Sequence, residues 1–290
     1  MDQHSLLLNL LVAEAESERP KLFEQYHENT KLHPENMPQT GRGQLDPNRR
    51  LTREVTRVVI EEMESVIATG GKKYALAQKH ALPHALDSIE TVRFKDVLLR
   101  RKSSQRFNRS RLSSREIGVL CEATYGWNAK QIIRDAEGEI GFRYVPSAGR
   151  LYPLELYLLI PSSKAARQCK LTHYAPDDHA LQHLQQFSES QLSDCFIDYP
   201  QPSPALVVFL TGVPARLTWK YGERSYRYVL LEAGHAGQNL QLAAAALGLD
   251  SCPIVGFYDD RVHDLLDVDG VSEILLYSLF VGHPNRKSVK

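Results

Sequence analysis

The sequence has few cysteines, and none of them forms a ligand or redox motif. Four occur in 290 residues, and no two stand in a Cys-x-x-Cys spacing, which argues against zinc-ribbon and thioredoxin-like sites. The chain opens Met-Asp-Gln-His, without the basic and then apolar stretch of a signal peptide. We therefore expect reduced thiols and a cytoplasmic location.

Long apolar runs and a net charge are also missing. The longest apolar stretches, residues 205–210 and 274–281, are far shorter than the roughly 20 residues that a membrane-spanning helix needs, so we expect buried strands there. Lys plus Arg and Asp plus Glu number 35 each, so no overall field favours nucleic acid. Neither a membrane nor a nucleic acid is expected as a partner.

Several enzyme motifs are absent as well. The sequence contains no P-loop, no G-x-G-x-x-G and no G-x-S-x-G nucleophile elbow, which excludes the common nucleotide-binding and hydrolase signatures. His173, His179 and His183 stand close together, but no carboxylate or cysteine occupies a matching position. We expect a strand, a turn and then a polar helix bearing solvated histidines, and no metal site.

The clearest pattern lies in residues 219–252. Apolar residues recur there with helical spacing, and Gly248 stands where a helix end favours a positive φ. The middle, Ala233–Gly237, has small residues on both sides of His235, so another helix or a flat ligand could approach closely. A tightly packed core helix explains the spacing equally well. The amides of Gln238 and Asn239 favour a site, because a buried amide needs a partner.

The rest of the chain divides into recognisable elements. Residues 5–16 and 52–69 are helix candidates around a loop at 34–50, and the second helix could cover its own domain or a partner. Ser113 and Glu116 have the spacing of a capping box, which predicts a helix ending at Gly126. Strands are expected at 154–160, 205–211, 253–257 and 273–282, with a short helix at 262–266.

A basic stretch occupies residues 94–111. It contains six Lys and Arg residues between Arg100 and Arg111 without an acidic one. A solvated loop explains such a run. A phosphate site explains it too, because Ser hydroxyls, backbone N–H groups and guanidinium groups together satisfy phosphate oxygens.

Three short motifs together resemble one family. The run Lys220–Arg224 (Lys-Tyr-Gly-Glu-Arg), then Glu232–His235 and Gln238–Leu240, resembles the SagB/ThcOx-type dehydrogenases, the azoline oxidases of the FMN-dependent nitroreductase superfamily. The resemblance covers roughly residues 96–284. It implies an α+β fold with a mostly antiparallel sheet sandwiched by helices, and a homodimer in which two chains share each FMN. We divide the chain into a helical N-terminal segment, 1–93, and an FMN-binding catalytic domain, 94–290.

The resemblance also implies which residues bind FMN. An Arg-Arg-Ser-x-Arg element holds the phosphate in this superfamily, and here Lys102 replaces an Arg, which loses the bidentate fork. A Pro-Ser-x-Gly element lines the isoalloxazine ring. The residues assigned to cofactor binding are Lys102, Ser104, Arg106, Pro146, Ser147, Gly149, Asn239, Gly256 and Arg286, the last as added positive charge near the phosphate.

Lys220 and Tyr221 match the catalytic Lys-Tyr pair of the family. Oxidation of a thiazoline or oxazoline to the azole removes a proton from one ring carbon and a hydride from its neighbour, so the protein must supply a base while FMN takes the hydride. A neighbouring ammonium lowers a tyrosine pKa, burial raises it, and a desolvated lysine could act as a neutral amine. Which of the two is the base stays open.

The resemblance implies a peptide or carrier-protein-bound azoline substrate and a synthetase or cyclodehydratase partner. Two other functions remain open at this point. One is an NAD(P)H-dependent nitro or flavin reductase, because the fold alone allows any flavin reduction. The other is a noncatalytic docking subunit of a biosynthetic complex.

Overall fold

The computed structural model describes residues 22–31, 71–89, 92–108, 110–135, 138–163 and 168–285. The helices expected at 5–16 and 52–69, and Arg286, lie outside these ranges. The chain divides into two compact units, residues 1–49 and residues 50–290. The described part of the first unit contains helix α2 (Leu22–Asn29).

The second unit is built on an antiparallel sheet of seven strands, in the order β1-β6-β5-β4-β7-β9-β8. Each neighbouring pair is antiparallel. The strands are β1 (Gln78–Ala81), β4 (Leu154–Ser163), β5 (Gln168–Ala175), β6 (Ala180–Ser188), β7 (Leu206–Gly212), β8 (Asp250–Ile254) and β9 (Ile274–Gly282). A separate hairpin joins β2 (Trp127–Asp135) to β3 (Gly138–Arg143).

The two faces of the sheet bury different cores because side chains alternate along each strand. On β4, Leu156 and Leu158 belong to one apolar cluster, whereas Tyr157 and Leu159 belong to the other. Strand β7 alternates in the same way. Both of these central strands are therefore buried on two sides, which explains their almost continuous apolar sequences.

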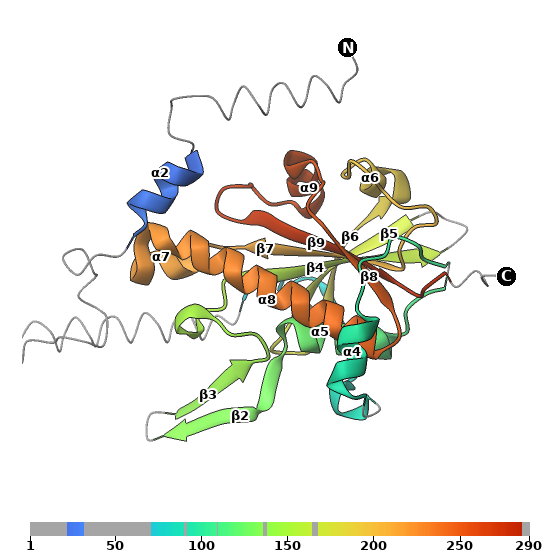
Figure 1. Ribbon diagram of the computed structural model, residues 1–290, viewed down its shortest axis with the longest axis horizontal. Coiled ribbons are helices and arrows are strands. Elements are labelled where there is room, and N and C mark those ends of the chain that lie inside the picture. Colours follow the sequence, from blue (N-terminus) through green and yellow to red (C-terminus); the bar gives the residue numbers. More distant parts are fainter. Residues whose placement is uncertain are drawn as a thin grey trace, which may run out of the picture. The chain divides into compact units, whose positions relative to one another are not determined.

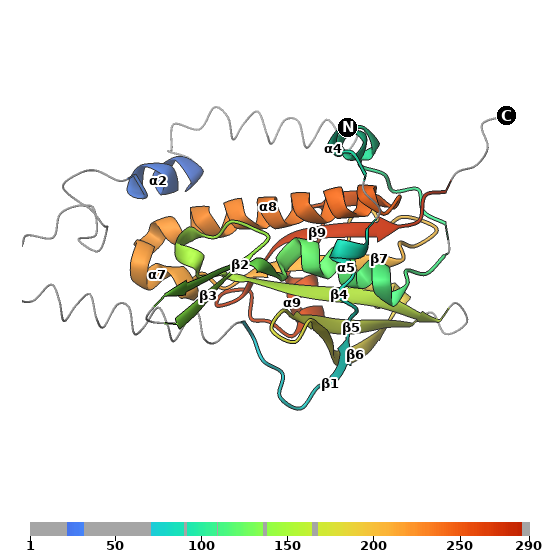
Figure 2. The same cartoon turned by 90° about the horizontal axis from the view of Figure 1, so that it is seen from below.

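Helices cover both faces of the sheet (Figures 1 and 2). Helices α5 (Ser114–Tyr125) and α8 (Ser225–Ala246) lie together on one face, with α7 (Ala215–Tyr221) and α4 (Phe94–Arg100) near opposite ends of α8. The short helices α6 (Glu189–Ser193) and α9 (Asp259–Leu266) contribute buried side chains to the core on the other face. Short 3-10 helices occur at η1 (Leu86–Ser88), η2 (Ala148–Arg150) and η3 (Gly222–Arg224).

Several local predictions are confirmed. Ser113 and Glu116 form the expected capping box at the start of α5, and the helix ends at Gly126. Gly248 follows α8 with a φ of 74°. The predicted α+β fold, a mostly antiparallel sheet between helices, is also confirmed.

Three expectations need correction. Residues 180–188 form strand β6 and not a helix, because they pair with β5 across a tight turn at residues 176–179. Strand β1 pairs with β6, so residues 78–81 belong to the main sheet although we placed them in the helical N-terminal segment. The basic stretch begins with a helix, α4, before it becomes irregular at residue 101.

All four cysteines are free and buried, as expected for reduced thiols. Among the helices of the described residues, none combines the length and the apolar character needed to cross a membrane.

Candidate active site

The turn before β4 places a glycine under the two residues predicted to be catalytic. Gly149 has a φ of 63°, in the left-handed region. A Cβ atom added there would lie 2.8 Å from the Tyr221 Oη and 3.0 Å from the Lys220 Nζ. Any side chain at this position would displace both groups. The structure thus brings the predicted ring-binding turn and the predicted Lys-Tyr pair into one site.

Helix α7 carries the Lys-Tyr pair in its last turn, and a buried ion pair fixes the helix to the sheet. Arg216 contacts the Glu155 carboxylate and donates a hydrogen bond from Nη1 to the Tyr152 carbonyl (3.2 Å). His173 Nε2 lies 2.7 Å from Glu155 Oε2. Burial opposes ionisation of Glu155, but the hydrogen bond with His173 and the charge of Arg216 outweigh it and lower its pKa to about 2. The carboxylate therefore stays charged at neutral pH.

Neighbouring rings fix the position of Tyr221. Its ring meets that of Tyr228 edge-on at a centroid distance of 5.0 Å. Arg224 Nε donates a hydrogen bond to Tyr228 Oη (3.2 Å), and Lys220 Nζ lies 5.3 Å from the Tyr221 ring centroid. Burial, followed by the proximity of Tyr228, raises the pKa of Tyr221. The tyrosinate form is therefore less accessible here than in a solvated tyrosine.

A buried glutamate holds the other side of the same turn. The Tyr125 hydroxyl donates to Glu232 Oε1 (2.8 Å) and accepts a hydrogen bond from the Leu154 N–H (2.9 Å). The Ser147 hydroxyl lies beside Glu232 and accepts a hydrogen bond from the Tyr152 N–H (3.0 Å), whereas the buried Glu232 Oε2 has no hydrogen-bond partner among the described residues. The carboxyl group therefore supports the Tyr125 hydroxyl, which supports the Leu154 N–H, and the Ser147 hydroxyl beside it supports the Tyr152 N–H.

The surroundings of Glu232 make it only marginally acidic. Burial raises its pKa to about 7, although the two hydroxyls and the charges of Arg143 and Arg216 act in the opposite direction. The guanidinium carbon of Arg143 lies 4.2, 4.7 and 4.8 Å from the ring centroids of Tyr125, Trp127 and Tyr152. These rings take up much of the guanidinium surface, so this cation compensates the carboxylate only in part.

The predicted phosphate residues form a second cluster beside β8. The Ser104 N–H donates to the Ser251 carbonyl (3.0 Å), and Lys102 Nζ lies 3.6 Å from Asp250 Oδ2. Ser104 Oγ accepts a hydrogen bond from the backbone N–H of Arg106 (3.3 Å). Among the described residues, no acidic side chain contacts the exposed Arg106 guanidinium. A hydroxyl and two cationic side chains therefore gather on one short segment.

The other predicted residues occupy different places. Asn239 Nδ2 donates to the carbonyls of Ala123 (3.2 Å) and Tyr144 (3.4 Å), so it links α8 to α5 and to the approach to the turn. The Gly256 carbonyl accepts a hydrogen bond from the Ile197 N–H (3.0 Å). Pro146 is exposed at the start of the turn. Arg286 lies outside the described residues.

The two clusters lie at opposite ends of α8. The Lys-Tyr pair precedes the first residue of this helix, and the strand that contacts Ser104 comes after its last turn (Figure 1). A helix of 22 residues is about 33 Å long. Within one chain, the predicted phosphate residues and the predicted catalytic residues are therefore far apart.

The three histidines considered for a metal site do not meet. His173 contacts Glu155, whereas the His179 imidazole bonds to Tyr174 and to the Pro83 carbonyl. His179 instead joins His84 and Glu122, whose ligand atoms all lie within 4.8 Å of one another. The two imidazoles of that group stack at 4.2 Å, which does not aim them at a common ion. The expectation of no metal stays a prediction.

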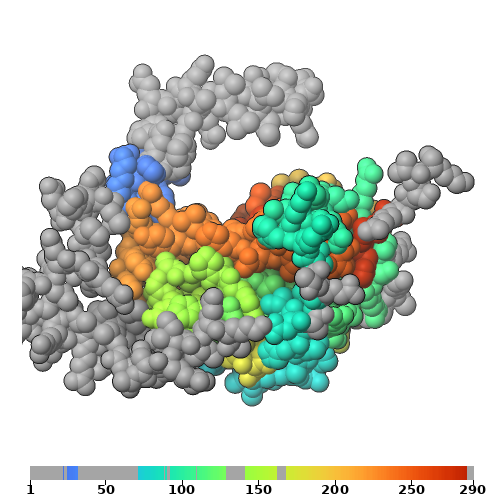
Figure 3. Space-filling model, turned by 60° about the horizontal axis from the view of Figure 1, so that its bottom comes forward, coloured from blue at the N-terminus to red at the C-terminus, as the bar shows by residue number. Residues whose placement is uncertain are grey.

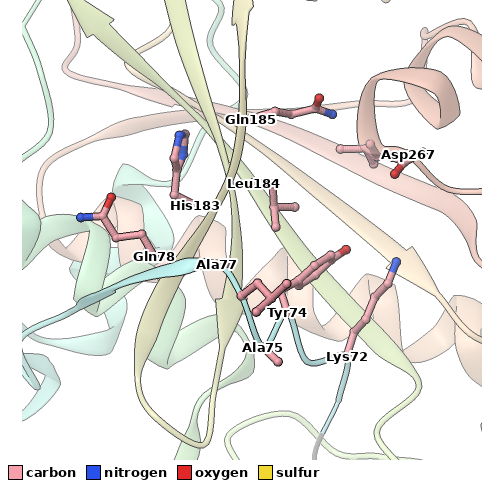
Figure 4. Close-up of a pocket in the computed structure, with 11 residues that line it drawn as sticks. Lys72, Tyr74, Ala75, Ala77, Gln78, His183, Leu184, Gln185 and Asp267 are labelled. Atoms are coloured by element: carbon pink, nitrogen blue, oxygen red, sulfur yellow. The ribbon is translucent and has the colours of Figure 1, made fainter.

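A cavity of about 710 Å³ lies elsewhere, between β6, the end of α9 and the segment leading to β1. Lys72, Tyr74, His183 and Asp267 line it (Figure 4). None of the predicted site residues does so. The candidate site is therefore the place where the turn meets α7, and this cavity is separate from it.

Residues 98–283 match the Nitroreductase family, which is more than half of the chain. The chain belongs to the nitroreductase family. Proteins of this family usually bind FMN.

Similar proteins fall into two groups by name. MJ1384 of Methanocaldococcus jannaschii is named as a nitroreductase and is 30% identical over 63% of this chain and 88% of its own. The trifolitoxin-processing protein TfxB of Rhizobium leguminosarum bv. trifolii is 30% identical over 51% of this chain and 41% of TfxB. The microcin B17-processing protein McbC of Escherichia coli is 28% identical over 49% of this chain and 55% of McbC. This chain spans about half the length of either processing protein.

Solved structures agree on the fold. A nitroreductase-type protein from Anabaena variabilis has a TM-score of 0.61 at 23% identity, covering 91% of this chain and 46% of its own. The E. coli McbBCD microcin synthetase complex with truncated pro-MccB17 contains a chain with a TM-score of 0.55 at 19% identity. The match covers 91% of this chain and 92% of that one. With the two processing proteins, these findings confirm the predicted resemblance to SagB-type dehydrogenases.

Sequence reasoning missed the buried residues that hold the site together. Glu232 appeared only within a motif, and Glu155, Arg143 and Arg216 were not considered. Glu232 does carry a signal, because it lies three residues after Val229 and four before Ala236 on the apolar face of α8. A carboxyl group on such a face requires a partner inside the protein.

The residues present fit an FMN. Gly149 leaves space under Lys220 and Tyr221 that a Cβ would fill. Ser104 and Arg106 offer a hydroxyl and a guanidinium, the donor types that bind a phosphate monoester.

The raised pKa of Glu232 predicts an unusual pH dependence of stability. The folded-state pKa of about 7 exceeds the ordinary 4.5, so the folded protein holds a proton that the unfolded chain releases between these values. Stability should fall as pH rises from about 4.5 to about 7, by on the order of 3 kcal/mol in total. Glu232→Gln removes this loss.

We therefore expect Glu232→Gln to unfold at a higher urea concentration than the wild type at pH 8, with the difference vanishing near pH 4. Urea unfolding followed by circular dichroism at several pH values measures this. An equal difference at every pH would contradict the assignment of the pKa.

Proposed function

We propose that this protein oxidises a peptidyl thiazoline or oxazoline to the azole with FMN as the cofactor. The observation that carries the proposal is the convergence of Lys220 Nζ and Tyr221 Oη on the space above Gly149. A reductase that passes hydride to an electron-poor acceptor needs no base at this position. Removal of a proton from a weakly acidic ring carbon does need one.

The reaction breaks two C–H bonds of the azoline ring and forms one ring double bond. Bound FMN would supply the hydride acceptor. Lys220 or Tyr221 would take the other hydrogen as a proton, and an external acceptor such as oxygen would later remove the two electrons. Gly149 keeps the space next to both side chains open for the ring carbon.

Between the two candidate bases, the structure favours Lys220. The raised pKa of Tyr221 makes its anion costly at neutral pH. Lys220 would act as the base after it loses its proton, and as a neutral amine it needs no buried anion, while a protonated Tyr221 can donate a hydrogen bond to the substrate. We therefore assign Lys220 as the base and Tyr221 as the residue that orients the azoline.

The names of the relatives support a peptide substrate. TfxB and McbC are named for processing trifolitoxin and microcin B17, and the McbBCD structure contains a truncated pro-peptide. By analogy, we propose a peptide or carrier-bound substrate and a synthetase or cyclodehydratase partner for this chain.

We also propose that two copies of the chain form each FMN site. The two clusters of predicted FMN residues are at opposite ends of α8, which is too far apart for one bound flavin to reach within a single chain. The outward face of α8 offers a surface for pairing, since Tyr226, Leu230 and Leu231 are 40, 44 and 60% exposed and Gly234 has open space above it. Figure 3 shows this helix (orange) along the surface from α7 to α4.

The first test of this function replaces the two catalytic candidates. Lys220→Ala should reduce azole formation by about 100-fold or more, the lower range for a general base, whereas Tyr221→Phe should reduce it by roughly tenfold. Both variants should retain FMN and its reduction by dithionite. The assay is mass spectrometry of a thiazoline-bearing peptide, which should lose two hydrogens. Full turnover in Lys220→Ala would contradict the assignment of Lys220 as the base. If the wild-type protein reduces nitroaromatics with NAD(P)H and oxidises no azoline, a nitroreductase function replaces the azoline oxidase function.

A second test uses two glycines with the same backbone conformation. Gly149→Ala and Gly248→Ala both introduce a side chain at positive φ and should each cost about 1 to 2 kcal/mol of stability. Only Gly149 has neighbours, because nothing lies within 4 Å of a Cβ at Gly248. We expect Gly149→Ala to lose most azoline oxidation and Gly248→Ala to keep it, measured at equal FMN occupancy. Equal loss in both would mean that backbone strain alone is responsible.

A third test examines the shared site by complementation. In a mixed dimer of Arg106→Ala and Lys220→Ala chains, a site shared between chains would combine the intact Arg106 of one chain with the intact Lys220 of the other. At limiting FMN the mixed dimer should recover up to half of the wild-type activity, whereas each homodimer stays low. No recovery in a mixed dimer verified by differential tags would place both residues of a site on one chain.

A further inference from the structure

The turn that presents Gly149 has a backbone conformation that needs outside support. Besides Gly149, Arg150 and Tyr152 have positive φ values of 60° and 44°. Residues with a Cβ rarely adopt this region, and they persist there only where surrounding contacts determine the conformation. The contacts here include the hydrogen bonds from the Leu154 N–H to Tyr125 Oη and from the Tyr152 N–H to Ser147 Oγ, and the Tyr125 hydroxyl in turn donates to Glu232.

We propose that Glu232 is a positioning residue for the Lys220–Tyr221 site, acting through the hydroxyl of Tyr125 on the segment that joins the Gly149 turn to β4. This inference rests on the proposed function for its effect on turnover. Its structural part, control of the turn by the carboxyl group, stands independently.

The direction of the hydroxyl protons explains why a carboxylate suits this position. An ionised carboxylate only accepts hydrogen bonds, so the Tyr125 hydroxyl must point its proton at Glu232. A lone pair of its oxygen then faces the N–H of Leu154. A protonated Glu232, or a glutamine, also carries a donor, which can compete with the Tyr125 proton and loosen the start of β4 next to the turn.

The titratable groups around Glu232 keep their charge states near neutral pH. Glu232 is therefore the group of this cluster whose charge changes there. Burial raises the pKa of Tyr125 and of Tyr152, so both phenols stay neutral. Arg143 and Arg216 face it from β3 and α7, and guanidinium groups keep their charge throughout this range. Protonation of Glu232 would therefore alter the turn without a simultaneous change in its neighbours.

A purely structural role would favour a neutral residue here. A buried carboxylate lowers stability above its pKa, and glutamine has nearly the same shape. A carboxylate that costs stability fits a role in which its hydrogen-bond direction matters for the site.

Tryptophan fluorescence tests the structural part without flavin or substrate. Trp127 lies beside Arg143 and edge-on to Tyr152, with ring centroids 5.4 Å apart, so it reports on this cluster. The sequence has two tryptophans, and Trp219→Phe leaves Trp127 alone. In that background we expect an emission change with a midpoint near pH 7, lost in Glu232→Gln. The matched control is Glu122→Gln, another buried glutamate, which faces His84 and His179 and should retain the change.

Turnover tests the functional part. Glu232→Gln should lower kcat for azoline oxidation by at least about tenfold while KM changes less than about threefold, because a small displacement of the turn misplaces the reacting groups. Glu232→Gln should also lose the step near pH 7 from the kcat profile. Tyr125→Phe, which removes the hydroxyl between Glu232 and the Leu154 N–H, should show a similar loss of kcat if Glu232→Gln fails to fold.

The outcomes separate the two proposals. A fluorescence change that survives in Glu232→Gln, or an unchanged kcat and pH profile in that variant, overturns the role of Glu232. If the wild-type protein oxidises no azoline but shows the Glu232-dependent change, the proposed function fails and control of the turn stands.

Discussion

The packing of α8 along the sheet is the constraint on which the arrangement of the site depends. The helix buries Val229, Ala233, Ala236, Leu240 and Ala244 against β-strand side chains. Because the helix is a rigid rod of 22 residues, this contact holds the segments at its two ends at a set separation. The Lys-Tyr pair stands at one end and the segment with Ser104 and Arg106 at the other. A site that uses both ends is most simply completed by a second copy of the chain.

Two buried glutamates show how surroundings divide the tasks within the site. Glu155 contacts Arg216 and His173 directly, and its pKa falls to about 2. Glu232 accepts a hydrogen bond from the neutral Tyr125 hydroxyl, the Arg143 guanidinium lies over aromatic rings, and burial raises the pKa of Glu232 to about 7. The first carboxylate is therefore a permanent anchor for α7. The second can change charge under ordinary conditions, and it supports the part of the site that is under backbone strain.

The sequence was most informative where a structure depends on neighbours in the chain. The capping box at Ser113, the positive φ at Gly248 and the turn at Gly149 are local, and all three were predictable. Strand β6 was mistaken for a helix because its Gln- and His-rich sequence alternates poorly, and its conformation is set by pairing with β5. The residues around Glu232 come from α5, β3, the turn and α8. No pattern within a single stretch of sequence predicts that these four segments come into contact.

Tyr152 is where the two supports of the site come together. Its carbonyl accepts a hydrogen bond from Arg216, which belongs to the Glu155 anchor of α7. Its N–H donates to Ser147, which belongs to the Glu232 cluster, while its hydroxyl accepts a hydrogen bond from the backbone N–H of Arg143. A residue with a φ of 44° is thus bonded at its donor, its acceptor and its side chain. This one strained residue therefore links α7, which carries Lys220, to the turn that carries Gly149.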